Sequence, residues 1–188
     1  YPDVRCEALR EAISRFEQVN MEEILCGNGA AELFFAAVQA VWPQKALVIA
    51  PSFSEYEEAL RSVGAEVEYY YLCEEDNFQI RGDYVDKLSE EIDMIFLCNP
   101  NNPTGQTIDR DMLIKILDRC KKQNIVVILD ECFLEFLDEP NRYEMSDLKG
   151  EYPNLLIIKA FTKIFSMPGL RHGYEISSNQ AILEEMSW

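Results

Sequence analysis

The stretch that decides the fold is KAFTKIFSMPGLRHGY, residues 159–174. It directly follows the apolar run from Leu155 to Ile158, which predicts a buried strand. Because open α/β sheets bind ligands beyond the carboxyl ends of their strands, we expect Lys163 at such a site. Thr162 and Arg171 add a hydroxyl and a guanidinium suited to a phosphate. An amine nucleophile beside a phosphate site is what pyridoxal 5′-phosphate requires, although a solvated surface lysine also fits this stretch.

Three more apolar runs each precede a side chain that suits the same cofactor. The pairs are Ala46 to Ala50 with Phe53, Met94 to Cys98 with Asn102, and Ile125 to Leu129 with Asp130. In a parallel sheet the carboxyl ends of the strands share one edge, so we expect these side chains to converge with Lys163. The pattern predicts an α/β fold with a mainly parallel sheet and helices on both faces.

Each of these side chains has a chemical reason to be there. An aromatic such as Phe53 stacks on a flat ring. The prolines and glycine of the loop from Asn99 to Gly105 restrict its backbone, so Asn102 presents its amide in one orientation. A buried carboxylate such as Asp130 needs a cationic partner, and a protonated pyridine nitrogen is one. Taken alone, Phe53 is equally compatible with a core residue and Asp130 with a helix cap.

A glycine turn at Gly27-Asn28-Gly29 precedes an apolar helix expected to run to about Trp42. Glycines before a helix let backbone N–H groups and the helix dipole converge on an anion. The turn lacks the third glycine of a dinucleotide fingerprint and the lysine of a P-loop. By itself it is as well explained by an ordinary turn as by a phosphate site.

Composition narrows the class of protein. The 188 residues allow one sizeable core, and 48% hydrophobic with 27% charged residues is typical of a soluble globular domain. The net charge of −17 disfavours nucleic acid and anionic membranes as partners, and no run approaches the ~20 apolar residues of a membrane span. Six cysteines without a Cys-x-x-Cys pair indicate reduced thiols in a cytosolic protein. The single histidine disfavours a zinc site.

Periodicity and breakers predict the remaining elements. We expect a first helix with an apolar stripe of Cys6, Leu9, Ile13 and Phe16, and a helix capped by Asp109 with Leu113, Ile116, Leu117 and Cys120 on its apolar side. Further helices are expected over 56–63, 83–91 and 180–188, strands over 67–72 and 173–177, and an acidic linker over 138–151.

Three motifs resemble those of the fold-type I pyridoxal-phosphate enzymes, in the branch of histidinol-phosphate aminotransferase and threonine-phosphate decarboxylase. They are Thr-Lys followed by Gly-Leu-Arg-x-Gly-Tyr at 162–174, Asn-Pro-Asn-Asn-Pro-Thr-Gly at 99–105, and Gly-Asn-Gly-x-x-Glu at 27–32. The resemblance implies the large cofactor domain over 1–188, truncated at both ends and without the small carboxyl-terminal domain. It also implies a cytoplasmic homodimer that acts on a small amino acid or amino-phosphate.

The resemblance implies a role for each candidate residue. Lys163 and Asp130 are the implied catalytic pair, joined to the aldehyde and paired with the pyridine nitrogen. The implied cofactor contacts are Phe53 on the ring, Asn102 and the Phe133 position at the phenolic oxygen, and Gly29, Ala30, Ala31, Thr162 and Arg171 at the phosphate. Tyr1, in its Tyr-Pro context, is expected to reach the phosphate bound by the partner subunit.

Departures from the aminotransferase pattern bear on the reaction. Phe133 stands where typical aminotransferases carry a tyrosine, and Asp118-Arg119-Cys120-Lys121 resembles the threonine-phosphate decarboxylases, which serve cobalamin biosynthesis. Ala160 stands where relatives offer a hydroxyl, and Lys159 has the wrong spacing to replace Lys163. We expect a decarboxylase. A histidinol-phosphate or related aminotransferase, and a non-catalytic effector-binding module of the aminotransferase type, remain alternatives.

Overall fold

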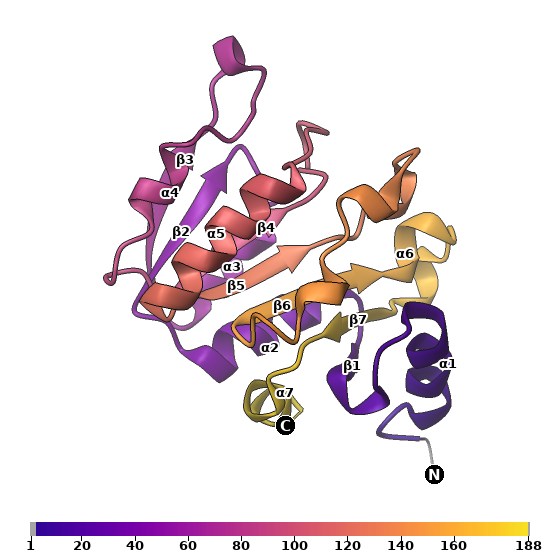
Figure 1. Cartoon of the computed structure of the whole chain (residues 1–188). Helices are drawn as coiled ribbons and strands as arrows, with labels where there is room; N and C mark the ends of the chain where they lie inside the picture. Colours follow the sequence, from indigo (N-terminus) through magenta and orange to yellow (C-terminus); the bar gives the residue numbers. More distant parts are fainter. Residues whose placement is uncertain (1–2, 188) are drawn as a thin grey trace.

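The computed structural model describes residues 3–187 and contains one seven-stranded sheet with helices on both faces (Figure 1). The strand order is β1-β7-β6-β5-β4-β2-β3. The strands are β1 (Ile24–Gly27), β2 (Lys45–Ala50), β3 (Glu66–Tyr71), β4 (Met94–Cys98), β5 (Val126–Asp130), β6 (Leu155–Ala160) and β7 (Gly173–Ile176). Only β7 runs antiparallel to its neighbours, which confirms the predicted, mainly parallel α/β architecture.

The register brings the carboxyl ends of the central strands to one edge. Cys98 of β4 lies beside Asp130 of β5, and Asp130 lies beside Ile158 of β6. Every residue of β4 and β6 is buried, as expected for central parallel strands that helices cover on both faces. This is why these strands are nearly continuous apolar runs in the sequence.

The α-helices are α1 (Glu7–Glu17), α2 (Ala30–Val41), α3 (Glu55–Ser62), α4 (Tyr84–Lys87), α5 (Arg110–Gln123), α6 (Phe161–Ile164) and α7 (Gln180–Met186). Short 3-10 helices span Met21–Glu23, Glu74–Asp76, Leu134–Phe136, Pro140–Arg142, Ser146–Leu148 and Pro168–Leu170. Among the residues described, no helix is both long enough and apolar enough to cross a membrane.

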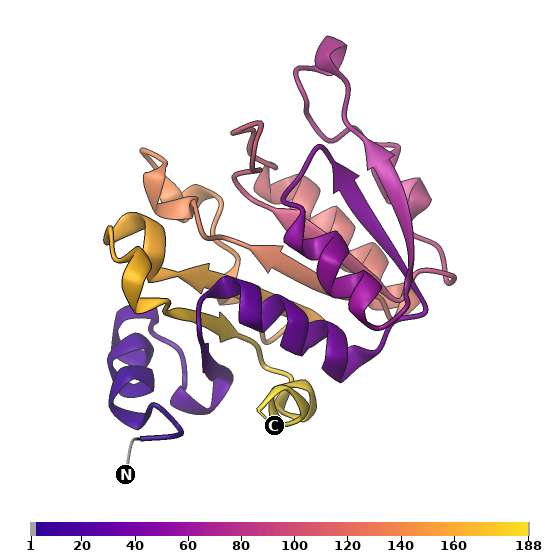
Figure 2. The ribbon, with the colours of Figure 1, turned by 180° about the vertical axis from the view of Figure 1, so that it is seen from behind.

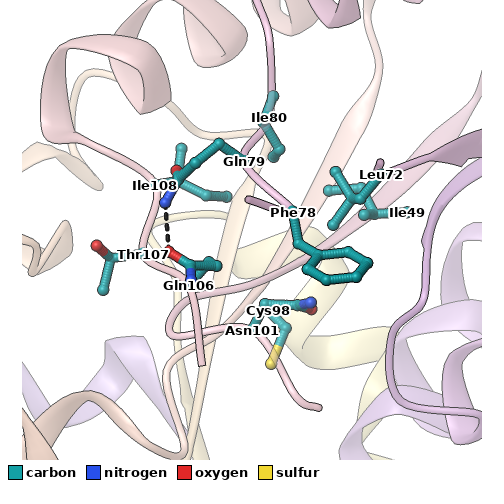
Figure 3. A pocket seen from close by; sticks show the side chains of 10 residues that line it. All are labelled: Ile49, Leu72, Phe78, Gln79, Ile80, Cys98, Asn101, Gln106, Thr107 and Ile108. Atoms are coloured by element: carbon teal, nitrogen blue, oxygen red, sulfur yellow. Dashed lines mark hydrogen bonds between the residues drawn. The ribbon is translucent and has the colours of Figure 1, made fainter. Parts of the chain in front are cut away.

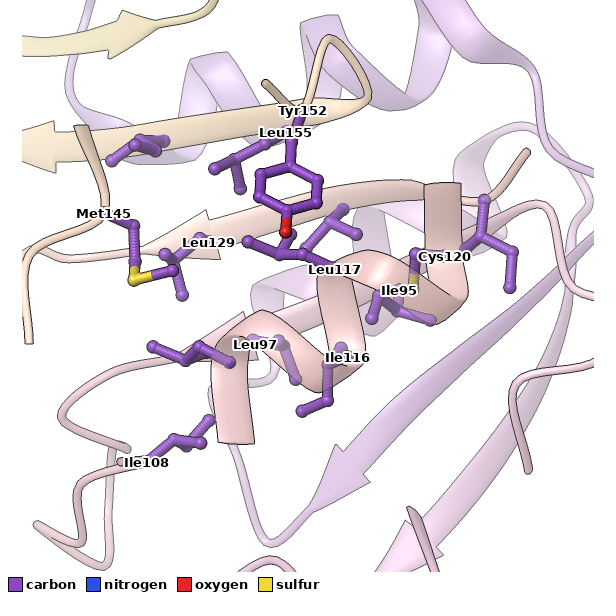
Figure 4. Packing of buried hydrophobic residues seen from close by; sticks show 14 of the residues in the cluster. Ile95, Leu97, Ile108, Ile116, Leu117, Cys120, Leu129, Met145, Tyr152 and Leu155 are labelled. Atoms are coloured by element: carbon purple, nitrogen blue, oxygen red, sulfur yellow. The ribbon is translucent and has the colours of Figure 1, made fainter. Parts of the chain in front are cut away.

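Two hydrophobic clusters lie on opposite faces of the sheet. The first packs α5 and α4 against the face seen in front in Figure 1, and the second packs α2 and α3 against the face seen in Figure 2. Figure 4 shows Ile116 and Leu117 of α5 meeting Leu97 and Leu129 of the sheet. Burying each such side chain contributes about 1.5–3 kcal/mol to folding, so these clusters hold the central strands in place.

Several local expectations differ from the structure. The helix expected over 83–91 is a single turn, because Leu88 leaves the helical conformation and its carbonyl accepts a hydrogen bond from Arg119 Nε at 2.8 Å. Asp109 occupies the expected cap position of α5 without a side-chain cap hydrogen bond. Phe16 is 66% exposed, because α1 lies at the β1 edge of the sheet where little covers it. The linker expected over 138–151 contains two 3-10 turns.

Candidate active site

Asp130 ends β5 with its carboxylate buried and hydrogen-bonded. The residue is 5% exposed, Oδ2 accepts a hydrogen bond from the hydroxyl of Tyr56 at 2.5 Å, and Oδ1 accepts one from the backbone N–H of Cys132 at 2.9 Å. Burial raises the pKa of Asp130, while the contacts with Cys132 and Tyr56 and the charge of Lys163 oppose that rise. A cation placed beside this carboxylate would stabilise its charged form further.

Lys163 lies on α6, which begins where β6 ends. Its side chain is exposed, and its Nζ lies 5.7 Å from the centre of the Phe133 ring. Its charge also acts on Asp130. The structure therefore brings Lys163, Phe133 and Asp130 to the same sheet edge, with the amine open to solvent.

Lys159, the rival lysine, is held in the protein interior. Its side chain is 4% exposed, and its Nζ lies 3.0 Å from Glu17 and 2.9 Å from Glu144. It pairs in register with Tyr174 of β7. A lysine committed to buried carboxylates has no free amine for an aldehyde, so Lys163 is the better nucleophile on geometry as well as spacing.

A site for an anion forms where α2 begins. Gly29 has a φ of 84°, and a Cβ built on it would lie 3.4 Å from Nη2 of Arg171, so the guanidinium stands over a bare α-carbon. Ala30 and Ala31 are the first residues of α2, whose N–H groups lack intrahelical partners. The positive helix end and Arg171 together favour a phosphate here. Thr162, half-buried on α6, follows β6.

The three asparagines of the loop after β4 differ in how their side chains are hydrogen-bonded. Asn99 accepts the N–H of Ile108 at 2.9 Å, and Asn101 donates to Pro51 O at 3.1 Å and to Thr104 Oγ1 at 2.9 Å. Asn102 is half-buried, and within the described residues its amide forms no hydrogen bond. The neighbours therefore hold the loop and leave the Asn102 amide available.

The aromatic side of the site is built from α3 and the segment just before it. Phe53 is half-buried and packs edge-on against Tyr56, with ring centres 5.6 Å apart and planes at 82°. Tyr56 in turn donates to Asp130. Tyr56 was not predicted to belong to the site. In the sequence it is a tyrosine three residues after Phe53, on the buried face of the following helix. An ordinary core tyrosine has the same sequence pattern.

A small cavity lies beside the site and not within it (Figure 3). Its volume is about 10 Å³, the space of roughly one water molecule, and Phe78, Asn101 and Ile108 are among its lining residues. Gln79 Nε2 donates to Gln106 Oε1 at 2.5 Å across it. These contacts pack the segment after β3 onto the asparagine loop and support that loop.

The residues present fit pyridoxal phosphate. A buried carboxylate stands ready for a ring cation, the bare α-carbon of Gly29 leaves room beneath Arg171, and the amine of Lys163 is exposed near Asp130. A protein that used Asp130 only as a helix cap would not need this combination. Tyr1, expected to act across a dimer, lies outside the described residues.

Comparison with known proteins identifies the family of this chain. Residues 1–187 match the family of class I and II aminotransferases. The chain is 37% identical to threonine-phosphate decarboxylase of Salmonella typhimurium, over 99% of this chain and 50% of the relative. It is 35% identical to histidinol-phosphate aminotransferase of Ruminiclostridium cellulolyticum, over 96% and 50%. The chain thus spans about half the length of the curated relatives it matches.

Solved structures give the same picture. Histidinol-phosphate aminotransferase from Clostridium acetobutylicum superposes with a TM-score of 0.89 at 33% identity, covering 99% of this chain and 54% of that one. L-threonine-O-3-phosphate decarboxylase from Porphyromonas gingivalis superposes with a TM-score of 0.83 at 26% identity, covering 100% and 56%. The chain therefore belongs to the class I and II aminotransferase family, whose cofactor is pyridoxal phosphate.

Proposed function

We propose that this chain is the cofactor-binding part of a pyridoxal-phosphate decarboxylase that acts on a phosphorylated amino acid, as threonine-phosphate decarboxylase does. The buried, doubly hydrogen-bonded Asp130 near the exposed amine of Lys163 supports the cofactor assignment. We place the enzyme in the cytoplasm, in keeping with six free cysteines, as a homodimer whose partner supplies Tyr1. With threonine phosphate as substrate, it would serve cobalamin biosynthesis.

Each candidate residue of the chain has its own role toward the cofactor. When bound, pyridoxal phosphate supplies an electron sink for a bond broken at the substrate α-carbon. Asp130 holds a proton at the pyridine nitrogen, and Arg171 with the start of α2 holds the phosphate. Phe53 stacks on the ring, and Asn102 donates to its phenolic oxygen. Lys163 provides the amine that joins the aldehyde and moves a proton at the α-carbon.

Phe133 is the observation that carries the choice of decarboxylation. Its ring lies under the Lys163 ammonium and offers no hydroxyl to the phenolic oxygen. The decarboxylase branch resembles this chain at that position. In addition, a putative threonine-phosphate decarboxylase of Caldanaerobacter subterraneus is 41% identical over 98% of this chain. The loss of one hydrogen bond to the cofactor is worth about 1 kcal/mol, and it favours the decarboxylase branch.

A histidinol-phosphate aminotransferase is the second candidate. It is supported by the TM-score of 0.89 and the 33% identity to the Clostridium acetobutylicum enzyme, against 0.83 and 26% for the Porphyromonas gingivalis decarboxylase. Both candidates use the same residues toward the cofactor. They differ in which α-carbon bond is aligned for cleavage, which depends on how the substrate is held.

The test is a pair of product assays on the polypeptide in its full natural length, with Lys163→Ala as control. The decarboxylase proposal expects carbon dioxide and an amino-alcohol phosphate from O-phosphothreonine, with no requirement for a 2-oxo acid. Glutamate formed from histidinol phosphate and 2-oxoglutarate, without carbon dioxide from phosphothreonine, supports the aminotransferase. Cofactor binding without turnover of either substrate points to an effector-binding module.

A further inference from the structure

Tyr56 is the nearest hydrogen-bonding side chain to the candidate ring carboxylate. It is fully buried on α3, and its hydroxyl donates to Asp130 Oδ2 at 2.5 Å across 74 residues of sequence. Burial and the negative charge of Asp130 both raise the pKa of the Tyr56 hydroxyl, so it keeps its proton and remains a donor. A hydrogen bond to a charged acceptor is stronger than one between neutral groups.

The aromatic surroundings hold Tyr56 in one place. Its ring stacks on Phe96 with centres 4.8 Å apart and planes at 18°. Phe34 meets it edge-on at 5.0 Å, and Phe53 meets it edge-on at 5.6 Å. Because close-packed rings restrict rotation, the hydroxyl stays aimed at Asp130. Phe53, the ring proposed to stack on the cofactor, therefore packs against the residue that holds the ring carboxylate.

Four of the segments around Asp130 present a group that bears on its charge. Tyr56 comes from α3, Cys98 from β4, Cys132 from the loop after β5 and Lys163 from α6. Burial raises the pKa of Cys98 and of Cys132, so both thiols stay neutral. The charged form of Asp130 therefore depends on Cys132, through its thiol and its N–H, on Tyr56 and on Lys163.

We propose that Tyr56 is a positioning residue that orients Asp130 and keeps it ionised for the pyridine nitrogen of pyridoxal phosphate. This inference rests on the proposed function. The backbone N–H of Cys132 donates to Oδ1, and the Tyr56 hydroxyl donates to Oδ2 and so fixes the orientation of the second oxygen. Without its hydroxyl, Asp130 binds a proton more readily, and that proton competes with the one on the ring nitrogen.

The experiment measures the affinity for pyridoxal phosphate as a function of pH, by absorbance titration, for the native chain and for Tyr56→Phe. Losing a hydrogen bond to a charged group shifts the carboxyl titration by about one pH unit or more. We expect Tyr56→Phe to lose affinity at a pH about one unit higher. At a fixed acidic pH its binding is then about tenfold weaker, while at alkaline pH the two proteins bind alike.

Tyr84→Phe is the matched control. Tyr84 is also fully buried, and within the described residues its hydroxyl has no hydrogen-bond partner. Its removal is expected to leave the pH profile unchanged. If Tyr56→Phe does not fold, 3-fluorotyrosine at position 56 keeps the ring and strengthens the donor, so the loss of affinity should move to lower pH.

The possible outcomes distinguish a failure of the role of Tyr56 from a failure of the proposed function. Native chain that binds no pyridoxal phosphate overturns both. Native chain that binds, together with a Tyr56→Phe profile that is unchanged or weakened equally at every pH, overturns only the role of Tyr56. A 3-fluorotyrosine profile that coincides with the native one overturns it as well.

Discussion

The Nζ of Lys159 lies 3.0 Å from Oε2 of Glu17, and both side chains are buried although 142 residues separate them. The ion pair joins β6 to the end of α1. Glu144 lies 2.9 Å from the same Nζ, Glu131 lies 3.9 Å away, and the hydroxyl of Tyr174 donates to Glu17. A single buried cation thus gathers several carboxyl groups around it.

Removing this cation should destabilise the fold. Lys159→Met keeps the length of the side chain but leaves Glu17 and Glu144 without their cation, and breaking a buried pair in this way costs about 3–5 kcal/mol. Urea unfolding measures the loss. Arg15→Ala removes an exposed pair with Glu11 and should cost under about 1 kcal/mol. Equal effects of the two substitutions would contradict a structural role for Lys159.

Stability should fall as the pH rises from about 5 to 8. Burial raises the pKa of Glu131 to about 8, against 4.5 for the exposed group, mainly by desolvation and despite the charge of Lys159. A carboxyl with a raised folded pKa contributes stability that is complete below its unfolded pKa and is lost as pH passes the folded value. The slope from this one group is at most about 1.4 kcal/mol per pH unit.

Glu131→Gln tests that assignment. Its free energy of unfolding, measured by urea titration at several pH values, should depend less on pH between about 5 and 8 than that of the native chain. Glu175, also fully buried with a raised pKa, adds a slope of the same sign, so some dependence remains. A native profile that rises over this range is incompatible with the account.

Gly173 should not tolerate a side chain. A Cβ there would lie 2.7 Å from the backbone nitrogen of Ala30, so Gly173→Ala must displace β7 or the start of α2. Overpacking of this kind costs about 1–3 kcal/mol, and it would also disturb the phosphate site. Thermal unfolding and cofactor titration measure the two effects. Gly150→Ala meets nothing within 4 Å and should change neither, and a silent Gly173→Ala would refute the close approach.

Arg171 should recognise the phosphate and not the ring. Arg171→Ala is expected to weaken pyridoxal phosphate binding by about 10- to 100-fold, the value of a hydrogen bond to a charged group, while binding of pyridoxal changes little. Equilibrium dialysis with both compounds gives the ratio of affinities. Arg15→Ala, which removes an exposed guanidinium paired with Glu11 on α1, is the control. Equal weakening toward pyridoxal would show that Arg171 acts elsewhere.

The fold was largely predictable because its central strands are covered on both faces and so appear as unbroken apolar runs. β4 was predicted at its observed bounds, Met94–Cys98. The helix expected over 83–91 failed for a different reason. The helix ends just before Leu88, whose carbonyl accepts a hydrogen bond from Arg119, 31 residues further on. Local periodicity cannot reveal a contact between residues so far apart in the sequence.

The candidate site was also predictable only in part. Residues that follow strand ends, such as Asp130 and Lys163, could be placed at one edge because parallel strands share that edge. Tyr56 could not, because it lies on a helix face where a core tyrosine looks identical until its contact with Asp130 is known. The buried ion pair between Lys159 and Glu17 was not predicted either, because the sequence pattern of the first helix places Glu17 on its solvated face.

The central claim is that the amine of Lys163 joins the aldehyde of pyridoxal phosphate. Borohydride reduction of the chain loaded with the cofactor fixes that linkage, and peptide mass spectrometry then identifies the modified lysine. The account predicts the phosphopyridoxyl group on Lys163, and its loss in Lys163→Ala. Label on Lys159, or label spread evenly over surface lysines and unchanged in Lys163→Ala, would contradict it.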